Sequence, residues 1–238
     1  MKYFYIIFIV FFSAKIHAAK FKYRTLFNNC PVKSAGSFVL EAVKIFEKDP
    51  SLKTMKDNIV KHSLKEKYFI ANYKINYRPF RKFLKFDLNC SHPLMKVQIY
   101  KKNGIDSQKA ILVDTGELYG SAYEKLLRAE NKLDTPLPFL ALPEGEFDEK
   151  LQNKITRVMN SVGINVKEKI SEIIVDKESN LTMILSVNDN PSSVFIGDQK
   201  WMKKVGKLGR IIDFMDTKNT FPSIINLTNS EKVVVKFR

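Results

Sequence analysis

The sequence predicts an α+β fold, in which an N-terminal apolar segment precedes a small α/β module and a mixed, mostly antiparallel β domain with flanking helices. An uncharged apolar block opens the chain, and short alternating patterns typical of strands are interspersed with helical patterns through the body. With 238 residues, 45% of them hydrophobic, the chain can form one large or two small cores.

The apolar block follows a short basic start, which is typical of an export signal. As a helix it would reach about 18 Å, or about 25 Å if it extends to Ala19, whereas a hydrocarbon core is roughly 30 Å thick. Residues 1–19 are therefore expected to be a signal anchor or a cleaved signal peptide. In both cases the body is expected to work outside the cytosol, facing a membrane or tethered to it. The residues expected to contact lipid are Tyr3, Phe4, Ile6, Ile7, Phe8, Ile9, Val10, Phe11 and Phe12.

The charge is unevenly distributed, which predicts two modules after a linker at residues 20–37. Residues 51–110 contain 14 Lys or Arg residues and four Asp or Glu residues. Residues 111–180 contain nine Lys or Arg residues and thirteen Asp or Glu residues. We place the first module at residues 38–103 and the second at residues 108–238. The basic module suits the anionic lipid head groups of a membrane better than nucleic acid, because it has no recognition motif. Lysines that simply solvate the surface are the alternative.

In the first module, residues 38–46 are read as a strand because apolar residues alternate with their neighbours there. Ser51 is expected to begin a helix. Residues 67–82 are aromatic and basic without a clear period, and residues 83–88 and 94–100 are expected to pair as a hairpin. The predicted apolar face of the helix is Leu52, Met55, Ile59, Val60 and Leu64.

The second module is predicted to hold short strands, a rigid loop and two helices. The loop spans residues 136–145, one helix spans residues 147–162, and Asp198 is expected to cap the other, which carries Trp201. The predicted strands are residues 110–114, 118–119, 172–175, 181–187, 194–197, 223–227 and 232–237, of which the last two form a closing hairpin.

Cys30 and Cys90 are the two cysteines of the chain. In an oxidising compartment they could form a disulfide that stabilises the fold by about 4 kcal/mol, and two unrelated thiols are the alternative. No second pair lies near them in the sequence, so we expect no metal cluster and no cofactor.

The string most typical of catalysis is Leu112-Val113-Asp114-Thr115-Gly116, which resembles the way aspartic proteases present a carboxylate. Such enzymes need two aspartates that share one proton. The chain has one such string, so a membrane-associated protease using Asp114 would have to be a dimer. Glu117 also occupies a position where a crowded catalytic loop needs a small residue. An exported binding protein is the remaining alternative.

Taken in order, several stretches resemble the bacterial cell-division family FtsQ, also called DivIB. Residues 91–99 resemble the last strand pair of the family's POTRA module. Residues 111–119 resemble the opening of its β domain, and residues 137–145 resemble its leucine-proline loop ending in Pro-Glu-Gly. Residues 194–197 with the helix after them, and then residues 222–227 and 233–236, are similar to its closing elements.

This resemblance implies a non-catalytic division scaffold with no small-molecule substrate. It implies a single-pass protein of the inner membrane whose periplasmic body recruits the small bitopic partners FtsB and FtsL. A chain that is cleaved and secreted to the periplasm is the alternative. A short strand at a sheet edge can accept a strand from a partner through its unpaired backbone groups. We therefore expect the partner to bind at the final strand, through Val233, Val234, Val235, Lys236 and Phe237.

Overall fold

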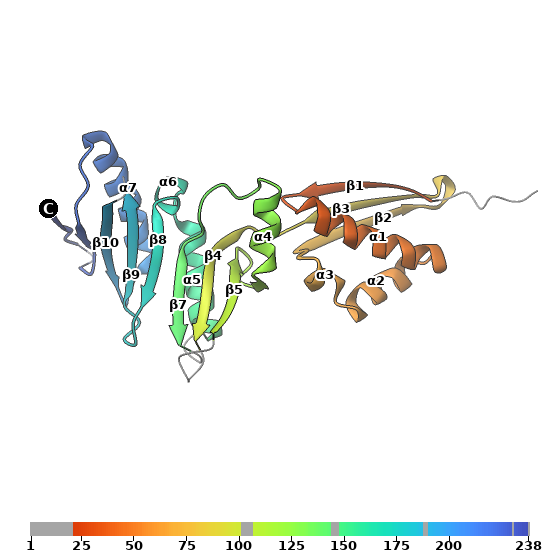
Figure 1. The fold of residues 1–238 in the computed structure, drawn as a ribbon, viewed down its shortest axis with the longest axis horizontal. Helices are drawn as coiled ribbons and strands as arrows, with labels where there is room; N and C mark the ends of the chain where they lie inside the picture. The colour runs from red at the N-terminus through yellow and green to blue at the C-terminus, as the bar shows by residue number, and fades with distance from the viewer. Residues whose placement is uncertain (1–20, 101–106, 144–147, 188–189, 230, 238) are drawn as a thin grey trace, which may run out of the picture.

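The computed structural model describes residues 21–100, 107–143, 148–187, 190–229 and 231–237, which form an elongated α+β molecule with one sheet at each end (Figure 1). Of the predicted fold class, the α+β architecture with a large mixed sheet and flanking helices is confirmed in these residues. The predicted membrane segment lies outside them. Within the ranges described, no helix combines the length and the apolar character needed to cross a bilayer.

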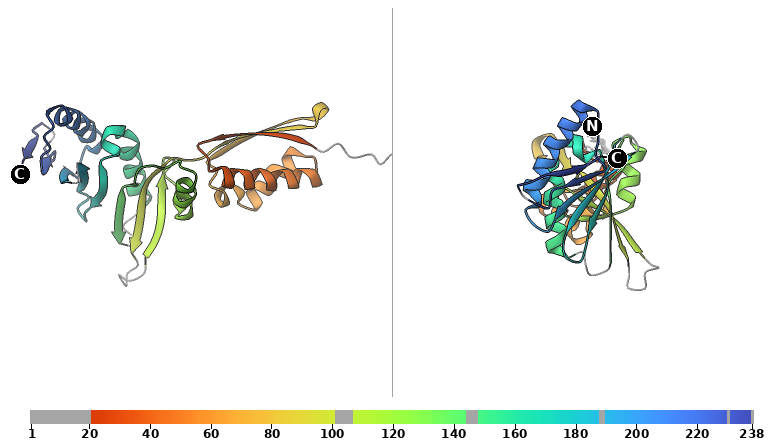
Figure 2. Two further views of the ribbon diagram at one scale, coloured as in Figure 1. Left: turned by 45° about the horizontal axis from the view of Figure 1, so that its top comes forward. Right: turned by 90° about the vertical axis from the view of Figure 1, so that its left-hand side faces the viewer.

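The N-terminal sheet has the strand order β1-β3-β2, with β1 parallel and β2 antiparallel to the central β3. Three helices pack against one face of this sheet, and the side chains between the two layers form their own core (Figure 2). The elements of this N-terminal unit are β1 (Lys22–Asn28), α1 (Val32–Lys48), α2 (Leu52–Lys61), α3 (Leu64–Lys67), β2 (Asn72–Arg78), the 3-10 turn η1 (Pro79–Arg81) and β3 (Phe83–Asn89).

The strand predicted at residues 38–46 is wrong, because these residues lie inside α1. Their buried side chains are spaced at the helical period and not at the period of a strand. Leu40, which a buried strand would cover, is 52% exposed. The buried residues of this stretch are Phe38, Val39, Ala42, Val43 and Phe46.

The start of α2 agrees with the sequence, since the Ser51 hydroxyl accepts a hydrogen bond from the Thr54 N–H at 3.2 Å. Met55, Ile59 and Leu64 are buried as predicted, but Val60 is 74% exposed. The face of α2 that meets the core is therefore narrower than the sequence pattern indicated.

Two further predictions for the N-terminal half are wrong. Residues 22–28, expected in a linker, form β1, and residues 83–88 do not pair with residues 94–100. Because β3 already has β1 and β2 on its two sides, it has no free side for the next strand. That strand, β4 (Pro93–Tyr100), belongs to the second sheet, so the two sheets divide near Ser91 and not near residue 103.

The C-terminal sheet of the described residues has the order β12-β11-β10-β9-β8-β7-β4-β5-β6, and five of its eight neighbouring pairs are antiparallel. Its further strands are β5 (Ser107–Val113), β6 (Leu118–Gly120), β7 (Phe139–Pro143), β8 (Ile170–Val175), β9 (Leu181–Val187), β10 (Asn190–Gly197), β11 (Ile224–Asn226) and β12 (Val234–Lys236). The stretch predicted as a rigid loop thus contains β7, while the predicted closing hairpin is confirmed by the β11–β12 pair.

Helices cover both faces of this larger sheet. The helices α5 (Glu149–Ser161), α6 (Ile164–Lys167) and α7 (Trp201–Lys218) bury their apolar sides in the main core. The helix α4 (Ala122–Ala129) packs on the opposite face, where Lys96 of β4 and Glu124 of α4 form a 2.9 Å ion pair. Asp198 does not cap α7, whose N-cap is Lys200 in the left-handed region.

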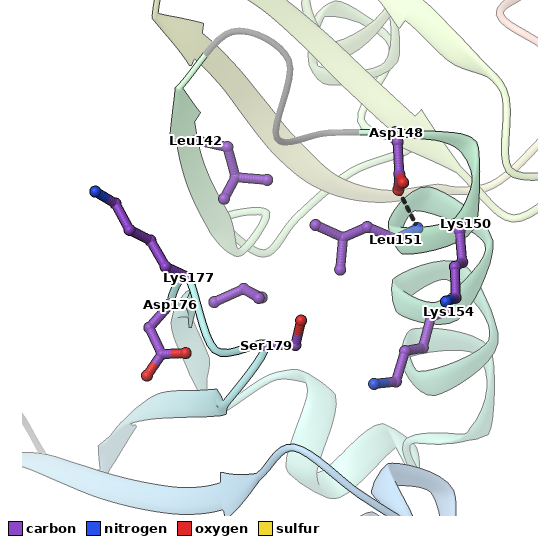
Figure 3. Close-up of a pocket in the computed structure, with 9 residues that line it drawn as sticks. Leu142, Asp148, Lys150, Leu151, Lys154, Asp176, Lys177 and Ser179 are labelled. Atoms are coloured by element: carbon purple, nitrogen blue, oxygen red, sulfur yellow. Dashed lines mark hydrogen bonds between the residues drawn. The ribbon is translucent and has the colours of Figure 1, made fainter.

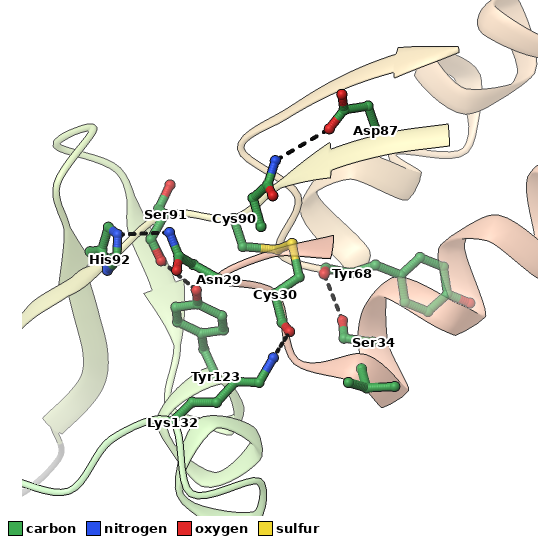
Figure 4. The surroundings of a disulfide bond; sticks show 12 residues. Asn29, Cys30, Ser34, Tyr68, Asp87, Cys90, Ser91, His92, Tyr123 and Lys132 are labelled. Atoms are coloured by element: carbon green, nitrogen blue, oxygen red, sulfur yellow. Dashed lines mark hydrogen bonds between the residues drawn. A yellow bond between two sulfur atoms is a disulfide. The ribbon is translucent and has the colours of Figure 1, made fainter. Parts of the chain in front are cut away.

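A set of direct contacts joins the two units around a disulfide between Cys30 and Cys90 (Figure 4). From the C-terminal unit, the Tyr123 hydroxyl donates to the Ser91 carbonyl, and the Lys132 ammonium donates to the Cys30 carbonyl. Phe69 of the N-terminal unit packs with its ring centroid 5.0 Å from that of Tyr123. The contacts tie the β1–α1 loop, which holds Cys30, and the segment from Cys90 to Ser91, which leads out of the N-terminal unit, to Tyr123 of α4 and to Lys132 beyond it.

Glu130, which follows α4, adds a helix cap across the same junction. Its carboxylate accepts hydrogen bonds from the Val32 N–H at 2.6 Å and from the Lys33 N–H at 3.1 Å, at the N-terminus of α1. Burial alone would raise the pKa of Glu130, but these two backbone donors and nearby Lys132 outweigh it, so the pKa lies below its usual value. One carboxylate therefore satisfies two helix N–H groups that have no partner within the helix.

Candidate partner-binding site

The final strand lies at one edge of the nine-stranded sheet in the described part of the chain. β12 pairs with β11 in the register Ile224–Lys236, Ile225–Val235 and Asn226–Val234, and no strand of the described residues pairs with its other side. Three apolar residues at this edge are solvent-accessible, with Val233 42%, Val234 62% and Phe237 44% exposed. A short strand with free backbone groups and uncovered apolar side chains is a surface on which another strand can be added.

A groove runs beside this edge, between β12 and α7. It has a volume of about 420 Å³ and an apolar floor, with basic side chains of α7 at its rim. Val235 packs on the main core below the groove, whereas Phe214 of α7 is 57% exposed. The groove is lined by Lys207, Arg210, Ile211, Phe214, Met215, Val233 and Val235.

A buried lysine fixes the backbone that leads into β12. Lys204 of α7 is 3% exposed, and its ammonium donates to the Ile196 carbonyl at 2.7 Å and to the Thr228 carbonyl at 2.9 Å. At the other end of β12, the Ser223 N–H donates to the Lys236 carbonyl at 2.9 Å. Sequence reasoning missed Lys204, because a lysine in a helical pattern ordinarily indicates a solvated face.

Asp114, the candidate protease residue, lies in a turn after β5. Gly116, two residues further along, has a φ of +87°, which favours glycine. Burial lowers the pKa of Lys167, and the negative charge of the nearby Asp114 carboxylate opposes this lowering. The second apolar-apolar-Gly string ends at Gly197 in β10, which is five strand positions away, or about 24 Å at the usual strand spacing. Within one chain, the two strings are therefore kept apart.

A second hollow of about 370 Å³ lies between the start of α5 and the β8–β9 turn (Figure 3). Both carboxylates in its lining accept hydrogen bonds from backbone N–H groups. Asp148 accepts one from the Leu151 N–H at 2.7 Å, and Asp176 accepts one from the Asn180 N–H at 2.8 Å. No cluster of three or more metal-ligating side chains occurs in the part of the chain that is described.

Comparison with solved structures gives a partial likeness. No family model matches the chain, and no curated protein matches it. Among solved structures, the chain is similar to the major extracytoplasmic domain of the bacterial cell division protein DivIB from Geobacillus stearothermophilus, in its trans isomer. The identity is 16% and the TM-score is 0.32, over 53% of this chain and 95% of that one. A likeness of this size assigns no function to the chain.

The predicted site residues thus fall into three groups. Val233, Val234, Val235, Lys236 and Phe237 lie together on and beside the edge strand β12. Cys30 and Cys90 are joined by a disulfide at the junction. The predicted lipid-contacting residues lie within residues 1–20, which are outside the described ranges.

Proposed function

We propose that this chain is a non-catalytic scaffold of bacterial cell division that recruits small bitopic division proteins of the FtsB and FtsL type by strand addition at β12. In this proposal, the N-terminal apolar segment tethers the chain to the inner membrane and the body lies in the periplasm. The motif resemblance described above suggests the class of partner, and the edge position of β12 carries the proposal.

The edge and the groove together favour an extended partner segment with apolar side chains. A strand added to β12 would gain backbone hydrogen bonds, and apolar side chains on one of its faces would enter the groove beside Phe214. Because Arg210, Lys232 and Lys236 surround the edge, acidic residues flanking the partner strand would increase its association rate.

The test is a binding titration with purified extracytoplasmic segments of FtsB-type and FtsL-type proteins. The variant Val234→Asp places a carboxylate where the partner strand would cover an exposed valine. We expect a loss of about tenfold or more in affinity, since burying one valine contributes about 1.5 kcal/mol.

The matched control is Leu118→Asp in β6, the strand at the opposite edge of the same sheet. Leu118 is 37% exposed, so the substitution changes charge and apolar surface in a comparable way. If both variants bind like the parent chain, strand addition at β12 is wrong. If the parent chain binds neither segment, the scaffold proposal itself fails.

A further inference from the structure

The outer face of the N-terminal sheet is bare in the described residues, because α1, α2 and α3 all pack on its other face (Figure 2). Strand alternation sends every second side chain outward. The strand register places these side chains in rows, in which Lys22, Phe83 and Arg78 stand side by side and Arg24, Lys85 and Asn76 form the next row.

This face carries a concentrated positive charge. A hollow of about 990 Å³ on it is lined by five cationic side chains and by no acidic one. None of these five forms a salt bridge with a described residue. Asp87 lies in the following row, where it accepts a hydrogen bond from Asn28 at 3.2 Å. The five cations are Lys22, Arg24, Arg78, Arg81 and Lys85.

A fully exposed aromatic side chain stands at the tip of the same sheet. Phe80, in the turn η1 between β2 and β3, has a relative exposure of 103%, and Arg81 and Lys82 follow it. The Lys82 carbonyl accepts a hydrogen bond from the Lys22 N–H at 3.0 Å, so this tip lies beside the start of β1. In the sequence, the apolar block ends only eight residues before Lys22, at most about 28 Å of chain.

We propose that this cationic face and its Phe80 tip bind a membrane surface that contains anionic lipids. The Arg and Lys side chains contact lipid phosphates, for which the planar guanidinium of arginine is well suited. Phe80 enters the interfacial layer, where the burial of an exposed aromatic ring is favourable. Each cation near an anionic surface increases binding by about fivefold.

The cationic face lies at the end of the molecule opposite to the C-terminus, beside which β12 is found (Figure 1). A chain bound to the membrane through this tip presents its partner-binding edge away from the lipid, with the rest of the molecule in between. The two sites can therefore be tested separately, and the lipid site does not depend on the proposed function of β12.

The experiment uses residues 21–238, so that the apolar segment cannot insert and mask the effect. All buried residues of the three core clusters lie between Cys30 and Leu227, so this body retains them. Cosedimentation is measured with vesicles of phosphatidylcholine alone and with vesicles containing about one third phosphatidylglycerol. We expect binding to the second kind only, and the pair Arg78→Gln and Arg81→Gln should weaken it by about 25-fold.

The matched control is the pair Lys56→Gln and Lys61→Gln on α2, which removes the same charge from the helical side of the unit and should leave binding unchanged. The variant Phe80→Trp adds a direct readout, because the native Trp201 is 2% exposed and gives a constant background. Its emission should shift to the blue with phosphatidylglycerol vesicles.

Three outcomes would overturn the proposal. One is equal binding to both kinds of vesicle, and another is equal weakening by the α2 pair. The third is binding of a single-stranded DNA oligonucleotide without binding of phosphatidylglycerol vesicles, which would assign the face to nucleic acid instead.

Discussion

Removing the disulfide should destabilise the N-terminal unit far more than the C-terminal one. Cys30 and Cys90 lie 60 residues apart, and the loop that they close contains α1, α2, α3, β2 and β3. In the chain-entropy model, a cross-link that closes a loop of this length lowers the conformational entropy of the unfolded chain by about 14 cal/mol/K. At 25 °C this loss stabilises the folded state by about 4 kcal/mol. The double variant Cys30→Ala and Cys90→Ala is expected to lose this amount of unfolding free energy.

Two spectroscopic probes distinguish the units during urea unfolding. Trp201, the one tryptophan of the chain, is buried in the C-terminal core and reports that unit, whereas far-ultraviolet circular dichroism reports both. With a denaturant slope of about 1 kcal/mol/M for a unit of this size, the N-terminal transition should move by several molar. The fluorescence transition should stay close to its original position.

The control is the parent chain unfolded after reduction, which keeps both sulfur atoms and so isolates the effect of the covalent link. The reasoning is refuted if reduction lowers the unfolding free energy by less than about 1 kcal/mol. It is also refuted if both probes shift together by the same amount, because the cross-link would then act on the molecule as a whole.

Two further substitutions test single contacts. Glu130→Gln should cost about 1 kcal/mol at neutral pH by weakening the cap of α1. The folded-state pKa of Glu130 lies below the ordinary glutamate pKa of 4.5. The extra stability of the parent chain over the variant is therefore fully present above pH 4.5, and it is lost as the pH falls through the folded-state pKa. Urea midpoints across the acid range check this, and a difference that does not change with pH would contradict it. Lys204→Met leaves the Ile196 and Thr228 carbonyls without their buried donor and should lower the free energy of unfolding by about 2 kcal/mol. Urea unfolding followed by Trp201 fluorescence measures this loss. An unchanged midpoint would show that the two hydrogen bonds do not contribute to stability.

Local sequence patterns predicted the C-terminal half better than the N-terminal half. The strand predicted at residues 181–187 matches β9, and the helix predicted at residues 147–162 contains α5. The strand predicted at residues 38–46 was wrong because a short apolar run is compatible with both the two-residue period of a strand and the 3.6-residue period of a helix. The helical period was overlooked. The hairpin predicted from residues 83–88 and 94–100 was wrong because two strands that are adjacent in the sequence were assumed to pair with each other.

The candidate sites depended on long-range structure to different degrees. The exposed apolar residues at the C-terminus were expected to form the edge strand, and the structure places them there. The groove that Phe214 lines could not be predicted, since α7 and β12 come together only through their packing on the same sheet. The cationic face likewise combines Lys22, Arg78 and Lys85 from three strands that are distant in sequence.

By itself, the sequence determined the fold class, the apolar N-terminal segment, the excess of positive charge and the pairing of the last two strands, because each depends on composition or on neighbours within about ten residues. Only the tertiary structure decided which strands lie at the sheet edges, that Cys30 meets Cys90, and that the cations share one uncovered face. These features follow from pairings between distant segments, whose free energy is absent from any local pattern.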